Sequence, residues 1–146
     1  MARLGGLINR IRRPVTLGVR GIVRDGEGRV LLVRHTYVPG WYLPGGAVDR
    51  GESAVEALTH ELLEEANVRM LGTPRLLAIC FNPRAGSDHV ALFEVGDFEQ
   101  TGPKTADHEI AEVRFFPLDA LPEGTTLATR GRLDELLSGG SISPTW

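Results

Sequence analysis

The sequence has very little cysteine, with Cys80 as the one residue of this type among 146. A single cysteine excludes an intramolecular disulfide and a cysteine-rich metal site. Cys80 lies inside the apolar run of residues 76–81, and no neighbouring base that would activate a nucleophilic thiol can be identified. A buried structural thiol is therefore expected. Such cysteine usage fits a reducing compartment, and we expect a cytoplasmic protein.

Long hydrophobic runs are also lacking. No stretch approaches the roughly 20 apolar residues that span a bilayer, and the N-terminus has no apolar signal-peptide core. Charge of one sign does not dominate either, because 16 Lys and Arg against 19 Asp and Glu leave a net charge of −3. That balance does not favour a dedicated nucleic-acid binder. We expect a small-molecule partner, no membrane span and no clear nucleic-acid binding, with a homodimer as an open alternative.

The length and composition are those of one globular domain. The chain has 146 residues, of which 42% are hydrophobic and 24% charged, enough to bury a core but too short for two ordinary domains. Residues 1–14 are basic and alternate with apolar residues. This favours a short helix packed on the domain or a partner subunit over contact with a membrane surface or nucleic acid. We expect residues 15–138 to form the domain and 139–146 a loose C-terminal tail.

The patterning along the domain runs strands, helix, strands, helix. A β-hairpin is predicted at the start, because two apolar strands flank the turn residues 25–28. Two prolines and three glycines in residues 37–46 indicate a shaped loop without regular structure. Ser53 and Asn67 are suited to cap the two ends of the central helix. The expected strands are 15–24, 29–35, 75–81, 89–95 and 112–116, and the expected helices are 54–66 and 127–137, the latter capped by Thr125 or Thr126. An α+β or α/β sandwich follows.

Three glutamates of the central helix share one face. At about 100° per residue, Glu64 and Glu65 fall roughly 60° and 40° on either side of Glu61, with an apolar stripe beside them. Like charges at this spacing repel. A hard divalent cation would offset the repulsion, since Mg²⁺ prefers oxygen ligands and bridges carboxylates to substrate phosphates. An acidic triplet alone is more often a solvated helix face. The residues of the preceding loop are therefore needed to distinguish a metal site from such a face.

That loop places Gly45, Gly46 and Glu52 at fixed distances before the acidic stripe. With residues 60–68 they fit the frame G-x5-E-x7-R-E-U-x-E-E-x-G-U, in which U is a bulky apolar residue. The glycine, all four glutamates and both apolar positions match, and the chain therefore resembles the MutT-like Nudix hydrolase family. The resemblance implies an α+β fold, a Nudix-type α/β/α sandwich with a mixed β-sheet, a central catalytic helix and a C-terminal helix.

Two positions depart from the frame. His60 stands where the family has an arginine that orients and charge-balances the neighbouring carboxylates. A histidine is shorter and only partly protonated at neutral pH. Either it makes a pH-dependent contact with Glu52 or Glu64, or it is a tolerated substitution on the shoulder of the helix. Asn67 replaces the last glycine, with little expected consequence, because asparagine also adopts the left-handed conformation that ends helices.

The resemblance implies a Nudix-type pyrophosphohydrolase, a metal-dependent hydrolase that cleaves a phosphoanhydride bond. Its substrate would be a nucleoside diphosphate linked to another moiety: a nucleoside triphosphate, a nucleotide sugar or a dinucleotide. Mg²⁺, with Mn²⁺ as a substitute, would be the cofactor. Glu61 would double as the base and Glu52 would orient the site. The implied metal ligands are the Gly45 carbonyl, Glu61, Glu64, Glu65 and, from a loop outside the frame, Glu109, with Asp107 and Glu112 as alternatives.

Substrate contacts are predicted less specifically. Arg34 at a strand end, and Trp41 and Tyr42 after it, are candidates for phosphate binding and base stacking. His35, His89, His108 and Arg84 are further candidates for contact with substrate phosphate. Residues of these types are as often ordinary surface, lid or core groups.

Two other functions compete. A non-catalytic Nudix-like nucleotide-binding or regulatory domain gains some weight from His60, although the intact glutamates oppose it. An isoprenoid diphosphate isomerase would need a catalytic cysteine, and Cys80 lies in an apolar strand.

Overall fold

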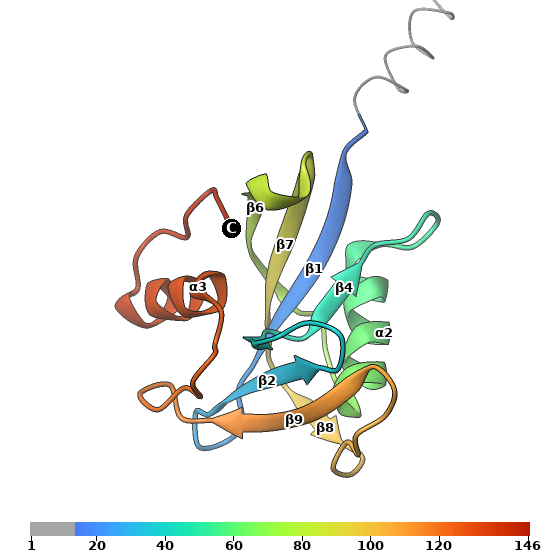
Figure 1. The fold of residues 1–146 in the computed structure, drawn as a ribbon, viewed down its shortest axis with the longest axis vertical. Coiled ribbons are helices and arrows are strands. Elements are labelled where there is room, and N and C mark those ends of the chain that lie inside the picture. Colours follow the sequence, from blue (N-terminus) through green and yellow to red (C-terminus); the bar gives the residue numbers. More distant parts are fainter. Residues whose placement is uncertain (1–13) are drawn as a thin grey trace, which may run out of the picture.

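The computed structural model describes residues 14–146. Two helices lie on opposite sides of a layer of strands (Figure 1), which confirms the expected α/β/α sandwich. The strands are β1 (Thr16–Val23), β2 (Val30–His35), β3 (Trp41–Tyr42), β4 (Gly45–Ala47), β5 (Val68–Met70), β6 (Arg75–Asn82), β7 (Asp88–Val95), β8 (Phe98–Gln100) and β9 (Ile110–Phe116), and the helices are α2 (Ala54–Ala66), α3 (Leu127–Ser138) and the short 3-10 helix η1 (Pro83–Ala85).

The larger sheet is mixed and has the order β4-β1-β7-β6. Strand β1 pairs with β7 in parallel along its whole length and with β4 antiparallel, and β6 runs antiparallel to β7 at the edge. A second sheet has the order β3-β2-β9, and β5 pairs with β8. The mixed sheet was expected, but β3, β4, β5 and β8 were not, because strands of two or three residues leave no periodicity to detect.

The predicted β-hairpin is wrong. The turn at residues 25–28 forms, with hydrogen bonds between the backbones of Asp25 and Gly28 and of Asp25 and Arg29. However, only the bridge between Arg24 and Val30 joins the two sides, and β1 and β2 then diverge into different sheets. Residues 30–33 of β2 and residues 21–23 of β1 are buried without interruption, a pattern of strands covered on both faces rather than of an isolated hairpin.

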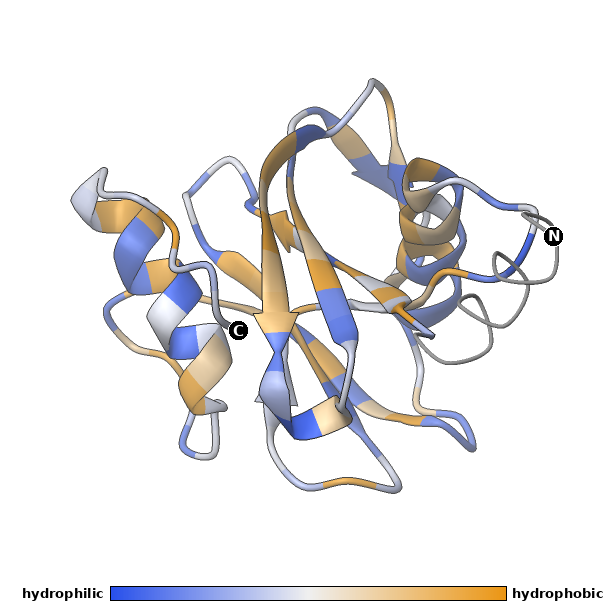
Figure 2. Ribbon diagram, turned by 90° about the horizontal axis from the view of Figure 1, so that it is seen from above, coloured by the Kyte–Doolittle hydropathy of each residue, from blue (hydrophilic) through white to orange (hydrophobic). Residues whose placement is uncertain are grey.

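The core has two parts, one under each helix. Leu58, Leu62 and Ala66 of α2 pack on β1 and β7 residues of the mixed sheet. On the other side, Leu133 of α3 packs with a cluster that includes Ile22 and Leu92. Figure 2 shows largely hydrophobic strands between the two helices. Since β1 contributes to both parts, burial of its two faces fixes the helices against opposite sides of the sheet.

The ends of α2 are set by its own sequence. Ser53 accepts a hydrogen bond from the backbone N–H of Glu56, whose carboxylate accepts one from the Ser53 N–H, which makes a capping box. Asn67 ends the helix in the left-handed conformation at φ 53°. The predicted bounds of this helix, and both caps, are confirmed. Helix α3 likewise begins after Thr126, which accepts from the Thr129 N–H.

Residues 139–146 are not the loose tail that was expected. The Phe81 N–H donates to the Pro144 carbonyl at 2.7 Å and the Trp146 N–H donates to the Phe81 carbonyl at 2.8 Å, so the tail pairs with the exposed edge of β6. An unpaired sheet edge offers free backbone groups to any extended segment nearby, which the sequence of the tail does not reveal. The basic segment predicted at 1–14 lies, apart from Pro14, outside the described residues. Within 14–146 no helix is long and apolar enough to cross a membrane.

The capping box yields a stability prediction. Ser53→Ala removes the acceptor for the Glu56 N–H, which should cost about 1 kcal/mol and lower the melting temperature by about 3 °C. Thermal unfolding followed by circular dichroism measures the shift. Ser141→Ala, in an exposed position, is the matched control and should leave the melting temperature unchanged. An equal shift in both variants would contradict the importance of the cap.

Candidate active site

The acidic face of α2 lies beside its buried stripe, as its helical spacing predicts. Leu58, Leu62 and Ala66 are fully buried. Glu65, next to them, is also buried, Glu61 is partly buried and Glu64 is exposed. The three carboxylates therefore differ in their contact with water, although they share one side of the helix.

Glu65 is held by two donors from outside the helix. Its Oε2 accepts a hydrogen bond from the backbone N–H of Gly45 at 3.2 Å. Its Oε1 lies 3.2 Å from Nε2 of His35, which is also buried at the end of β2. A buried carboxylate requires such partners, and these two tie α2 to β4 and to β2. His35 was a candidate substrate contact, but in the structure it is buried and its ring contacts Glu65.

The two glycines before the helix are required by close packing. A Cβ on Gly46 would collide with the carboxylate of Glu61. Gly45 has φ +150°, and a Cβ there would collide with the Val19 carbonyl of β1. The glycine of the sequence frame is thus explained, since only the absence of a side chain lets the Glu61 carboxylate reach the backbone of β4.

Glu61 carries the clearest electrostatic signature of the site. Burial, followed by the charges of Glu65 and Glu64, raises its pKa to about 7, and Arg20 partly opposes the shift. Nη1 of Arg20 donates to the carbonyls of Leu43 at 2.9 Å and Gly45 at 3.3 Å. Arg20 therefore fixes the backbone that faces the carboxylates but does not neutralise them.

A cavity of about 330 Å³ lies between α2 and the loop of residues 104–110, lined by Glu61, Glu64, Glu65 and Glu109 among others. Three loop carboxylates were candidates for assisting the helix. Asp107 is engaged, because it accepts from the backbones of Glu109 and Ile110 and pairs with Lys104. Glu112 pairs with Arg34 at 3.1 Å. Glu109 remains the candidate, since it lines the cavity and His108 is the one basic side chain paired with it among the described residues.

His60 makes the contact that was one of its two expected roles. Its Nδ1 lies 3.1 Å from Oε2 of Glu52, and the other oxygen of Glu52 accepts from the Asp49 N–H. Glu52 is close enough to Glu61 to contribute to raising its pKa. The histidine thus reaches the carboxylate of the frame despite being shorter than arginine, although its side chain is 64% exposed.

The three residues predicted to contact substrate lie in different environments in the structure. Trp41 is 7% exposed and packs edge-on against Phe116 in the core under α3, so the expectation that it stacks on a base is corrected to a core role. Arg34 is exposed but paired with Glu112. Tyr42 borders a larger cavity, and its hydroxyl donates to the Pro39 carbonyl.

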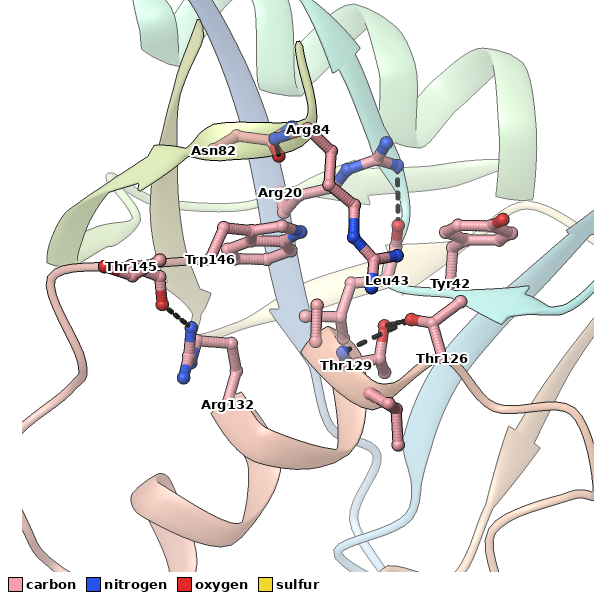
Figure 3. Close-up of a pocket in the computed structure, with 12 residues that line it drawn as sticks. Arg20, Tyr42, Leu43, Asn82, Arg84, Thr126, Thr129, Arg132, Thr145 and Trp146 are labelled. Carbon is pink, nitrogen blue, oxygen red and sulfur yellow. Dashed lines mark hydrogen bonds between the residues drawn. The ribbon is translucent and has the colours of Figure 1, made fainter. Parts of the chain in front are cut away.

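The larger cavity, of about 570 Å³, lies on the α3 side of β1 and was missed by sequence reasoning. Arg20, Tyr42, Leu43, Arg84, Thr126 and Trp146 are among its lining residues (Figure 3). Arg20 could have been noticed, because an arginine inside an apolar strand is unusual. Trp146 could not, because its position depends on the docked tail.

The donor set of the site suits a hard divalent ion. Carboxylate and carbonyl oxygens are what Mg²⁺ prefers, and it keeps several waters of its own. No three His, Cys, Asp or Glu side chains in residues 14–146 converge into a complete site, because Glu65 points to His35 and Gly45. The residues that fit are Glu61 and Glu64, which face one cavity and repel each other in the absence of a cation.

Comparisons with known proteins show the family of this chain. The NUDIX domain model matches residues 14–136. The CMP-5'-(N-acetyl-N-hydroxy-3-aminopropyl)phosphonate hydrolase of Streptomyces rubellomurinus is 34% identical over 110 residues, 70% of this chain and 52% of that protein. A nucleoside triphosphate pyrophosphatase/Nudix hydrolase fusion protein of Bifidobacterium longum is 33% identical over 108 residues, 66% of this chain and 22% of that protein. The chain thus spans well under two thirds of these relatives.

Among solved structures, the MutT NUDIX hydrolase of Burkholderia pseudomallei superimposes with a TM-score of 0.72 at 25% identity, over 85% of this chain and 99% of that one. The similarity extends over the sandwich rather than being confined to the acidic helix.

The raised pKa of Glu61 predicts a pH-dependent stability of the metal-free protein. The folded state retains this proton up to about pH 7, whereas the ordinary pKa of the group is 4.5. The stability contributed by the protonated group is therefore present below pH 4.5 and is lost as the pH rises through about 7. Glu61→Gln removes this loss. In EDTA we expect its melting temperature to exceed the wild type by about 3 °C at pH 8 and by less at pH 5, after allowance for solvent screening.

The matched control for this measurement is Glu123→Gln, an exposed residue without a salt bridge to any described cation. It should not change the pH dependence. A Glu61→Gln variant that is less stable than the wild type at pH 8 would show that the carboxylate is stabilising rather than repelled.

Proposed function

Because the chain belongs to the NUDIX family, we propose that it is a metal-dependent pyrophosphohydrolase acting on a nucleoside diphosphate linked to another moiety. One observation carries the proposal: the carboxylates of α2 meet the Gly45-Gly46 backbone, with Glu61 packed on Gly46 and Glu65 bonded to the Gly45 N–H. This arrangement collects negative charge around a cavity without supplying an equal number of cations, as a site for a divalent ion requires.

The proposed chemistry follows from the needs of the reaction. Hydrolysis of a phosphoanhydride requires neutralised phosphate oxygens and an activated in-line water, and Mg²⁺ or Mn²⁺ supplies both effects when it is bound. Glu61, Glu64 and the Gly45 carbonyl would hold the ion, with Glu109 from the opposite wall of the cavity. Gly45 can do so because a carbonyl has two lone pairs and Arg20 occupies one of them.

The remaining residues have supporting roles in this proposal. Glu65 is a further ligand once its side chain turns from His35. Glu61 is the candidate base, since a carboxyl with a pKa near the working pH can accept a proton from water and release it again. Glu52, held by His60 and by the Asp49 N–H, orients the Glu61 end of the acidic face of α2.

Both relatives named above have names that refer to nucleotides, and this supports a nucleotide substrate here. Nucleoside triphosphates, nucleotide sugars and dinucleotides share the diphosphate on which the carboxylate site would act. They differ in the group beyond it, which contacts loops and outer strands.

The first test is hydrolysis of a panel of nucleoside triphosphates, nucleotide sugars and dinucleoside polyphosphates with Mg²⁺, with Mn²⁺ and with EDTA. We expect metal-dependent turnover that Glu64→Gln reduces at least about 100-fold, because this removes a charged ligand but keeps the size of the side chain. Glu123→Gln serves as the control. Tight nucleotide binding without turnover under any metal condition would instead favour a non-catalytic binding domain.

A second prediction concerns His60. Its contact with Glu52 should matter for orientation, so His60→Ala should lower kcat roughly 10-fold, within the range found for residues that support metal ligands. His60→Arg should keep kcat at or above the wild-type value, because arginine can make the same contact. Steady-state kinetics of the three proteins at pH 7 measure this. Equal rates for the alanine variant and the wild type would identify His60 as a tolerated surface substitution.

A further inference from the structure

The docked tail gives the larger cavity a wall that the rest of the domain does not supply. Residues 143–146 pair with the edge strand β6, and the bridge between Phe81 and Thr145 places Trp146 beside the cavity. Figure 3 shows the indole near Arg20, Asn82 and Arg84, across from Tyr42 and Leu43. A segment that follows α3 thus contributes an aromatic side chain to a cavity built mainly from the first half of α3, with single residues from β1, β3, β6 and η1.

Arg132 holds this wall in place. Its side chain is 6% exposed, and two of its nitrogens bond to Glu135, each at 2.8 Å. Nη1 donates to the Thr145 carbonyl at 2.6 Å, and the guanidinium carbon lies 5.9 Å from the centre of the Trp146 ring. A buried arginine whose charge is neutralised and whose remaining donor binds the tail is a rigid support rather than a flexible surface contact.

The cavity has the size and lining of a small-molecule site. Its volume of about 570 Å³ falls in the usual range for ligand cavities, which combine apolar and aromatic walls with a few polar groups. Leu127 and Trp146 supply apolar surface, whereas the hydroxyl of Thr126 and the guanidinium of Arg84 supply polarity. No carboxylate of residues 14–146 forms an ion pair with Arg84, so its positive charge is available at the edge of the cavity.

A chain of hydrogen bonds links the lining of the cavity to the carboxylate site. Arg20 lines it and donates to the carbonyls of Leu43 and Gly45, and the Gly45 N–H donates to Glu65. The segment of residues 43–45 therefore has the cavity at one end and the acidic helix at the other. A nucleoside in the cavity would have its diphosphate directed along this segment.

A further cavity of about 680 Å³ runs along β1 and β4. Arg20, Asn82 and Trp146 line both cavities, so Trp146 lies where the two are adjacent.

We infer that Trp146 is a specificity-determining residue that stacks on the planar base of the substrate, with Arg132 as its positioning residue. The inference rests on the proposed function for the identity of the substrate. Base stacking on an aromatic side chain tolerates different bases, so Trp146 selects for nucleotides over base-free phosphates rather than for one base.

Fluorescence tests the stacking without requiring hydrolysis. The chain has two tryptophans, and Trp41 is in the core. In EDTA, nucleoside monophosphates, which contain no phosphoanhydride bond, should quench the wild-type emission, and ribose 5-phosphate should not. Trp146→Phe should abolish the quenching, because only Trp41 then remains. Quenching that persists in this variant, or that ribose 5-phosphate also produces, would overturn the inference.

Kinetics supply the second readout. On the best substrate of the panel, Trp146→Ala should raise KM roughly 10-fold with kcat within about 3-fold, and Trp146→Phe should restore most of the KM. Leu137→Ala, an exposed residue of α3 outside the cavity, is the matched control. Circular dichroism establishes that each variant is folded.

The outcomes separate this inference from the proposed function. Normal hydrolysis with an unchanged KM in Trp146→Ala, or with kcat and KM altered equally in Trp146→Phe, would refute the stacking role and leave the hydrolase intact. Quenching specific to Trp146 in a protein that hydrolyses nothing would support the stacking role and reject the hydrolase.

Discussion

The close packing of acidic side chains on a glycine backbone is the constraint on which the rest of this structure depends. Glu61 reaches the backbone of β4 because Gly46 has no Cβ, and Glu65 is buried because the Gly45 N–H and His35 bond to it. The two glycine contacts join α2 to β4, and the contact with His35 joins it to β2. Moving the helix by the width of one side chain would break these contacts and expose the apolar stripe that lies beside them.

This arrangement is unfavourable for the protein in the absence of a cation. Burial and two neighbouring carboxylates raise the pKa of Glu61 to about 7, so ionisation of Glu61 destabilises the folded state. The two core clusters provide compensating stability, because β1 is buried by helices on both faces. Functional sites typically contain such unfavourable interactions, which the stability of the surrounding core offsets.

Arg20 links the larger cavity to the backbone that faces the carboxylate site. It lies in β1, the strand shared by both halves of the core, and its guanidinium bonds to the backbone between the larger cavity and the carboxylates. On the α3 side, Arg132 has a similar role for the tail, since it binds Glu135 and Thr145 together. The partly buried Arg20 and the buried Arg132 therefore fix backbone segments on both sides of the proposed substrate path, and neither neutralises the acidic helix.

The sequence by itself determined the parts of this protein that depend on local spacing. The bounds of α2, its caps at Ser53 and Asn67, and the shared face of three glutamates follow from helical periodicity and from side chains that bond to nearby backbone. The tertiary structure alone decided that β1 and β2 part into two sheets, that Trp41 is a core residue, that Glu109 faces the cavity, and that the tail brings Trp146 to its wall. Those features arise from contacts between segments distant in the chain, and their geometry is set by packing and by free sheet edges, which leave no periodic signal in the residues themselves.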